Sequence, residues 1–172
     1  MRRYLAVIAV AAACSACAST GAVPQPFPLP GHANRPNASN PSDPSNPSIF
    51  DPYAATGTAL ALRGAPYRNG GADPDGFDCS GFTQYVFAQY GVQLPREVRD
   101  QFRWGKSVKP EEIAPGDLLF FTTTDPGASH VAIAIGSDEF VHAPSTTGVV
   151  RVERLRSSYW QPRFLGARRV ND

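Results

Sequence analysis

Helical and strand-like segments occupy different halves of the region from residue 53 to residue 172. "YAATGTALALRGAPY" predicts a short helix stopped by Gly64 and Pro66. Apolar residues at three- and four-residue spacing predict a second helix from Ser80 to Tyr90. A third helix is predicted in "LPREVRDQFRWG", with Pro95 near its start. Five later runs are rich in Val, Ile and Phe and predict strands: "GDLLFFTT", "HVAIAIG", "EFVHAP", "GVVRVERL" and "RFLGARRV". Helices followed by strands favour an α+β domain with an antiparallel sheet.

The segment 18–52 differs completely in composition from the region that follows it. Nine of the 17 prolines of the chain fall between Pro24 and Pro52, and "NRPNASNPSDPSNPS" contains almost no apolar residue. Such a segment buries too little surface to offset the entropy of ordering it. We therefore predict a disordered tether over residues 18–52 and a single folded domain over 53–172.

Residues 1–17 have the pattern of a secretory signal. Two arginines precede the apolar run Leu5–Ala13, which is too short to span a bilayer. "SAC" resembles a lipobox, so Cys17 is the predicted lipid-carrying residue, with Cys14 as the alternative and an ordinary cleaved signal as the simpler interpretation. Ala18 is not the aspartate associated with inner-membrane retention. We expect a chain anchored to the outer membrane of a Gram-negative bacterium and facing the periplasm.

The totals exclude several classes of function. The formal net charge of +1 gives no basic surface for nucleic acid. The region 53–172 holds one cysteine, so it has no internal disulfide, and no cysteine pair accompanies clustered histidines as in a structural zinc site. We expect neither a metal nor a nucleic-acid partner.

Cys79 lies where a loop becomes a helix, in "GFDCSGF". The reactive form of cysteine is the thiolate, and the backbone amides at a helix start stabilise negative charge. A lone cysteine is more often a buried, inert residue. Cys79, however, precedes the apolar face of the helix and is flanked by small or polar residues, which favours a nucleophile.

Two of the three histidines lie in consecutive predicted strands. His130 opens "HVAIAIG" and His142 lies in "EFVHAP", whereas His32 lies in the tether. In a hairpin the two would come together on one face of the sheet. Two ordinary strand histidines are an equally good interpretation of the spacing alone. Facing Cys79, they would provide a base and a group that orients it.

From about Ala59 to Val170 the chain resembles the NlpC-type cell-wall peptidases, papain-like cysteine endopeptidases that act on bacterial peptidoglycan. Seven pieces match in the order of that family: "GAPYRNGG", "GFDCSGFTQYVF", "GVQLPR", "APGDLLFF", "SHVAIAIG", "FVHA" and "YWQPRFLGARRV". The resemblance implies a papain-like α+β fold, with N-terminal helices packed on a central antiparallel β-sheet.

The resemblance also implies roles. Cys79 is the nucleophile, His130 the base and His142 the polar third member. Three further positions match residues near the substrate: Tyr67, as a helper of oxyanion binding, and Asp78 and Ser80, which line the cleft. The chain departs from the family pattern at three positions: Asn69, Ala132 and Ala134.

Other features have plainer interpretations. Arg96 suits either a substrate contact or a helix start, and Asp117 is expected to fix a turn. Three arginines are expected at a solvated edge or in ion pairs: Arg163, Arg168 and Arg169. The tryptophans Trp104 and Trp160 are expected to be packing residues.

The implied reaction is hydrolysis of a peptide bond in a peptidoglycan stem. The bond is either γ-D-glutamyl–meso-diaminopimelate or the D-alanyl–diaminopimelate cross-link. The steps need no cofactor, and we expect a monomer. Two alternatives are a catalytically silent peptidoglycan-binding lipoprotein and a related thiol acyltransferase.

Overall fold

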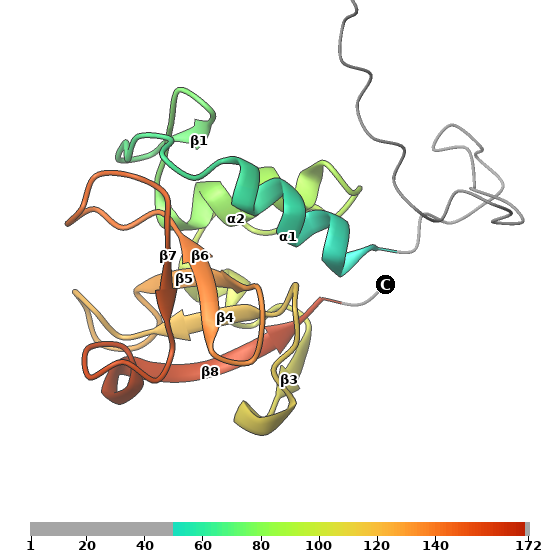
Figure 1. Cartoon of the computed structure of the whole chain (residues 1–172), viewed down its shortest axis with the longest axis vertical. Helices are drawn as coiled ribbons and strands as arrows, with labels where there is room; N and C mark the ends of the chain where they lie inside the picture. The colour runs from blue at the N-terminus through green and yellow to red at the C-terminus, as the bar shows by residue number, and fades with distance from the viewer. Residues whose placement is uncertain (1–49, 171–172) are drawn as a thin grey trace, which may run out of the picture. The chain divides into compact units, whose positions relative to one another are not determined.

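The computed structural model describes residues 50–170, which fall within one compact unit (Figure 1). The predicted signal, Cys14, Cys17 and nearly all of the predicted tether lie outside the described residues. The helices are α1 (Pro52–Ala61), α2 (Cys79–Ala88) and α3 (Val98–Gln101), with 3-10 turns η1 (Pro110–Glu112) and η2 (Gln161–Arg163). The strands are β1 (Ala72–Asp73), β2 (Gly76–Phe77), β3 (Lys106–Val108), β4 (Leu118–Phe121), β5 (His130–Ala134), β6 (Glu139–His142), β7 (Arg151–Arg154) and β8 (Phe164–Arg169).

Six strands form one antiparallel sheet in the order β3-β8-β4-β5-β6-β7, and β1 pairs with β2 in a separate hairpin. Helices α1 and α2 lie together on one side of this sheet (Figure 1). The predicted α+β class, with N-terminal helices on an antiparallel sheet, is confirmed.

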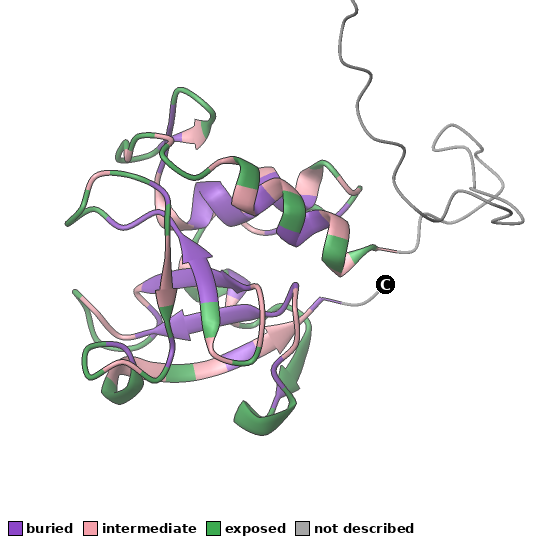
Figure 2. Cartoon of the chain, in the orientation of Figure 1, coloured by how far each residue is buried: buried purple, intermediate pink, exposed green. Residues whose placement is uncertain are grey.

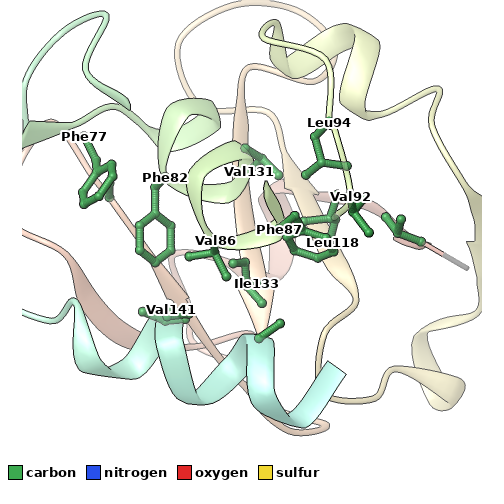
Figure 3. Packing of buried hydrophobic residues seen from close by; sticks show 14 of the residues in the cluster. Phe77, Phe82, Val86, Phe87, Val92, Leu94, Leu118, Val131, Ile133 and Val141 are labelled. Atoms are coloured by element: carbon green, nitrogen blue, oxygen red, sulfur yellow. The ribbon is translucent and has the colours of Figure 1, made fainter. Parts of the chain in front are cut away.

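The central strands are buried on both faces, as Figure 2 shows for β4 and β5. Alternate residues of a strand point to opposite faces, so each strand contributes to two clusters. Val131 and Ile133 pack under α2 with Phe82, Val86 and other apolar residues (Figure 3). On the other face, the apolar cluster consists of Val108, Ile113, Leu119, Phe121, Ala132, Ala134, Phe140, Leu155, Trp160 and Ala167. Ala132 and Ala134, two of the departures, therefore fill this second cluster.

The start of the domain differs from the prediction. Helix α1 begins at Pro52, and the side chain of its N-cap residue Asp51 accepts hydrogen bonds from the backbone N–H groups of Tyr53 and Ala54. The ring of Phe50 stacks on Phe87 with centroids 4.9 Å apart. These contacts place the last residues of the predicted tether in the folded domain. The boundary at 52/53 was therefore set too late.

The predicted third helix was too long. Only Val98–Gln101 is helical, and the chain turns at Gly105, whose φ of +78° favours glycine, before β3 begins. Strands β3, β1 and β2 were not predicted, because two or three residues are too few to show a periodicity. Trp104 is 45% exposed, so its predicted packing role was wrong.

The other structural predictions have specific outcomes. Asp117 accepts a hydrogen bond from the backbone of Ala114 and is paired with Arg169 through two 2.8 Å contacts, which confirms both the turn and the ion pair. Arg163 and Arg168 instead lie over the rings of Tyr159 and Phe102.

Candidate active site

The start of α2 is held by its N-cap residue. Asp78 has an extended backbone, and its Oδ1 accepts a hydrogen bond from the backbone N–H of Gly81 at 2.7 Å. Its Oδ2 accepts from the N–H of Gly70 at 3.0 Å. Cys79 is consequently the first helical residue, one position earlier than predicted. Within residues 50–170 the N–H groups of Cys79 and Ser80 donate to no backbone carbonyl, as is usual in a first helical turn.

Close packing against the backbone of Gly71 explains why residue 81 is a glycine. A Cβ added there would lie 2.0 Å from the carbonyl oxygen of Gly71, which no side chain can tolerate. The same oxygen accepts a hydrogen bond from the N–H of Asp78 at 3.0 Å. The helix start is therefore pressed against the Gly70–Gly71 turn, and this contact fixes where Cys79 lies.

Arg96 joins the two polar residues that flank Cys79. Its guanidinium donates to Asp78 Oδ2 at 2.5 Å and to Ser80 Oγ at 2.7 Å. Ser80 is 5% exposed. Asp78 and Ser80 are thus held in internal hydrogen bonds beside the nucleophile, and their direct contact with substrate stays a prediction. Arg96 itself braces the start of α2 rather than that of α3.

The thiol of Cys79 lies beside the backbone of β5, within hydrogen-bonding reach of the N–H of Val131. Val131 directly follows His130, so the nucleophile lies next to the strand end that carries the predicted base. Burial raises the pKa of Cys79 to about 11, and hydrogen bonding to the N–H groups of Val131 and Ser80 opposes this only in part. The expected stabilisation by first-turn amides is present, but burial outweighs it and the resting group is a neutral thiol.

Tyr67 lies in the same neighbourhood. Its side chain packs against the same apolar cluster as Cys79, and its N–H donates to the carbonyl of Gly148 at 2.7 Å. Burial raises the pKa of Tyr67, and the proximity of Cys79 and Asp78 raises it further. Its hydroxyl therefore stays protonated and can donate a hydrogen bond near the thiol.

The two histidines come together as predicted. Strands β5 and β6 pair with Ile133 opposite Val141, which puts His130 and His142 on the same face at diagonal positions. His130 Nε2 and His142 Nδ1 are 2.8 Å apart, a hydrogen bond. His130 is 8% exposed and His142 is fully buried.

Two residues that sequence reasoning did not place here lie behind the histidine pair. Glu153 of β7 has its Oε1 at 3.9 Å from His142 Nε2 and at 3.1 Å from Arg151 Nε. The indole N–H of Trp160 donates to the other carboxylate oxygen of Glu153. The Trp160 ring also stacks on His130, with centroids 5.5 Å apart. Trp160 is 5% exposed, so its predicted packing role is correct, and what it packs on is the candidate site.

Burial sets the protonation of this group. Desolvation, together with the neighbouring His142, lowers the pKa of His130 to about 3. Desolvation also lowers the pKa of His142, while Glu153 opposes this change. The interaction with His142, aided by Trp160, lowers the pKa of Glu153 to about 2. At neutral pH the site therefore holds a thiol, two neutral imidazoles and one carboxylate.

These pKa shifts predict a loss of stability in mild acid. An unfolded histidine binds a proton near pH 6.5, whereas folded His130 resists it until about pH 3. Between these values the unfolded chain binds more protons, so the free energy of unfolding falls as the pH falls. His130 alone should lower it by about 2–3 kcal/mol between pH 6.5 and 4.5. Urea denaturation at the two pH values measures this change.

The matched controls for that measurement are His130→Gln and His32→Ala. We expect His130→Gln to flatten the dependence on pH and His32→Ala to keep it. If the free energy of unfolding depended equally steeply on pH in wild type and in His130→Gln, His130 would not be the source of the acid sensitivity.

Residues 50–170 bring together no group of three His, Cys, Asp or Glu side chains suited to a metal ion. Within the same residues, no helix has the length and apolar character needed to cross a membrane.

Similarity to known proteins covers the region that carries this site. The sequence model of the NlpC/P60 family matches residues 64–169. The chain is 43% identical over 116 residues to the gamma-DL-glutamyl hydrolase of Bacillus subtilis, covering 65% of this chain and 28% of that protein. It is 41% identical over 123 residues to the murein DD-endopeptidase MepS/murein LD-carboxypeptidase of Escherichia coli, covering 71% of this chain and 61% of that protein. The chain thus spans less than two thirds of the length of both relatives.

A solved structure shares the fold. It is an NlpC/P60 family protein from Bacillus cereus, 32% identical, with a TM-score of 0.68 over 72% of this chain and 41% of that one. Residues 64–169, which the family model matches, contain the helix start and the two strands that carry the three candidate residues.

Proposed function

Since the chain belongs to the NlpC/P60 family, we propose that it is a cysteine-type peptidase that hydrolyses peptide bonds in the stem peptides of peptidoglycan. The observation that carries this proposal is the arrangement of three residues. Cys79 opens α2 beside the backbone of β5, and the His130–His142 hydrogen bond lies at the same strand end. The similarity to a protein named as a murein endopeptidase supports the choice of substrate.

The first half of the reaction forms a thioester. Cys79 Sγ attacks the carbonyl carbon of the scissile bond while its proton passes to His130. Because His130 Nε2 is hydrogen-bonded to His142, Nδ1 is the nitrogen that accepts the proton. The carbonyl oxygen becomes an oxyanion, which accepts a hydrogen bond from the backbone N–H of Cys79 with the Tyr67 hydroxyl as helper. One such donor typically contributes about 3 kcal/mol.

The second half releases both products. The C–N bond breaks as His130 protonates the leaving amine, and the acyl half stays on Cys79 as a thioester. Water then attacks the thioester carbonyl and gives a proton to His130. The C–S bond breaks, the thiolate recovers the proton from His130, and the product leaves as a carboxylic acid that releases its remaining proton to solvent. Because both groups begin neutral, His130 acts as a general base during the attack rather than as half of a preformed ion pair.

Two bonds are candidate targets: γ-D-glutamyl–diaminopimelate and the D-alanyl–diaminopimelate cross-link. One relative is named as a gamma-DL-glutamyl hydrolase and the other as a murein DD-endopeptidase/murein LD-carboxypeptidase, so their names do not favour one of the two bonds. The test is digestion of isolated sacculi followed by mass analysis of the released fragments. A new amine on diaminopimelate together with a free glutamate carboxylate identifies the first bond, and loss of cross-linked dimers identifies the second. Intact sacculi would refute the proposed activity.

The proposed location is the periplasmic face of the outer membrane, through a lipid on Cys17. We expect Cys17→Ala to move the protein from the membrane fraction to the soluble fraction of cells, because the anchor is lost. Cys14→Ala is the matched control and should stay membrane-bound. Fractionation followed by immunodetection measures both. The opposite pattern would assign the lipid to Cys14, and two soluble or two membrane-bound variants would refute the single anchor.

A further inference from the structure

We propose that Glu153 is a positioning residue that sets which ring nitrogens of His142 and His130 carry hydrogen, and so keeps the base nitrogen of His130 free for the Cys79 proton. Its effect on the rate rests on the proposed function. The hydrogen arrangement itself follows from contacts among described residues and is tested separately.

Glu153 is held as an acceptor. One of its oxygens takes the indole N–H of Trp160, which can only donate, and the other lies 3.1 Å from the Nε of Arg151, which also can only donate. The nearby His142 ring, together with Trp160 and Arg151, lowers the pKa of Glu153. The group facing the histidines from β7 is therefore a carboxylate with no hydrogen to give.

His142 Nε2 faces this carboxylate. The nitrogen is fully buried and has no hydrogen-bond partner within residues 50–170. The Oε1 of Glu153 lies 3.9 Å away, too far for a hydrogen bond yet close enough for strong attraction or repulsion in a buried site. An N–H pointing at the carboxylate is attracted to it, whereas a lone pair would be repelled. Nε2 of His142 therefore carries the hydrogen, and Nδ1 of the neutral ring carries the lone pair.

The position of the hydrogen on His142 also determines which ring nitrogen of His130 carries a hydrogen. Because His142 Nδ1 is an acceptor, the 2.8 Å contact requires His130 Nε2 to be the donor. A neutral imidazole has one N–H, so Nδ1 of His130 is left with its lone pair. This is the form that a general base needs. The opposite arrangement would put hydrogen on Nδ1 of His130 and would turn the lone pair of His142 Nε2 toward Glu153.

The same carboxylate acts when the base becomes charged. Once His130 takes the thiol proton, the histidine pair holds a positive charge in a buried site. The charged groups that face this pair from β7 are Glu153 and its partner Arg151, and Trp160 covers it from the segment before η2. Glu153 is the only negative group among these, so it stabilises the imidazolium without touching the substrate.

The kinetic test compares Glu153→Gln with Glu139→Gln on isolated sacculi. Glu139 is the matched control, because it lies in the neighbouring strand β6 and pairs with Arg154 at 3.6 Å on the surface. By analogy with carboxylates behind metal-binding histidines, we expect Glu153→Gln to lower kcat about 10–100-fold with little change in KM. The acid limb of the pH–rate profile should move to lower pH, because loss of the carboxylate lowers the pKa of the histidines. Glu139→Gln should match wild type.

The second test reads the hydrogens directly and needs no turnover. Nitrogen NMR of the full chain, with its three histidines, should show hydrogen on Nε2 and none on Nδ1 for both His130 and His142 at pH 7. Hydrogen on Nδ1 of either ring would overturn the proposal. A folded Glu153→Gln protein with wild-type kcat and pH profile would also overturn it, while leaving the proposed hydrolysis intact. A chain that shows the expected hydrogens but leaves sacculi uncut would refute the hydrolysis alone.

Discussion

Replacing Cys79 with alanine is expected to abolish hydrolysis of isolated sacculi while the protein stays folded. The side chain opens α2 beside β5 and is the one thiol in the described domain. Loss of the nucleophile in a triad of this kind lowers kcat on the order of 10⁶-fold. The fold should survive, because the helix start is held by Asp78 and the Gly70–Gly71 turn rather than by the sulfur. Release of soluble fragments measures the loss, and urea denaturation checks the fold.

Two further variants complete this test. Cys79→Ser should be as inactive as Cys79→Ala, because a hydroxyl in the same buried position is far harder to deprotonate than a thiol. Cys14→Ala is the matched control and should retain full activity on sacculi. Substantial hydrolysis by folded Cys79→Ala would refute the mechanism.

The second large effect is expected at the histidines. His130→Ala should lower kcat on the order of 10⁴-fold or more, because it removes the group that takes the thiol proton. His142→Ala should cost no more than this. His142→Gln should keep part of the activity, since an amide can accept a hydrogen bond from His130 Nε2 through its oxygen and donate toward Glu153 through its nitrogen. Steady-state kinetics of the three folded variants measure these differences.

The order of the histidine variants separates the two roles. An inactive His142→Gln beside an active His130→Gln would show that the roles of base and orienter are reversed. Equal activity of all histidine variants with wild type would mean that neither ring handles the proton.

Much of this architecture could be predicted from short patterns. The switch from helical to strand spacing predicts an α+β fold, because binary patterning follows the period of each element. The hairpin of β5 and β6 follows from two apolar runs joined by a short turn, and its pairing brings His130 and His142 to one face. The position of Cys79 follows from "DCSG", in which the aspartate caps the helix and Gly81 allows close approach to Gly71.

What could not be predicted depends on contacts between distant segments. Glu153 and Trp160 meet the histidines only because β7 pairs with β6 and the segment before η2 folds under the sheet. The signal in the sequence was weak: a strand with alternating Arg151 and Glu153 beside the strand of His142. The burial of Cys79, which raises its pKa, is a tertiary property that the sequence does not show. The length of α3 depends on Gly105, where the chain turns into β3.

The most direct test of the central claim is digestion of sacculi in water enriched in the heavy isotope of oxygen. Hydrolysis through a Cys79 thioester predicts stem-peptide fragments in which the new carboxylate carries one heavy oxygen, with a free amine on the partner fragment. Wild type should form them, and Cys79→Ala should not. Fragments joined to another acceptor without heavy oxygen would instead show an acyltransferase. Intact stems with wild-type protein would contradict the account outright.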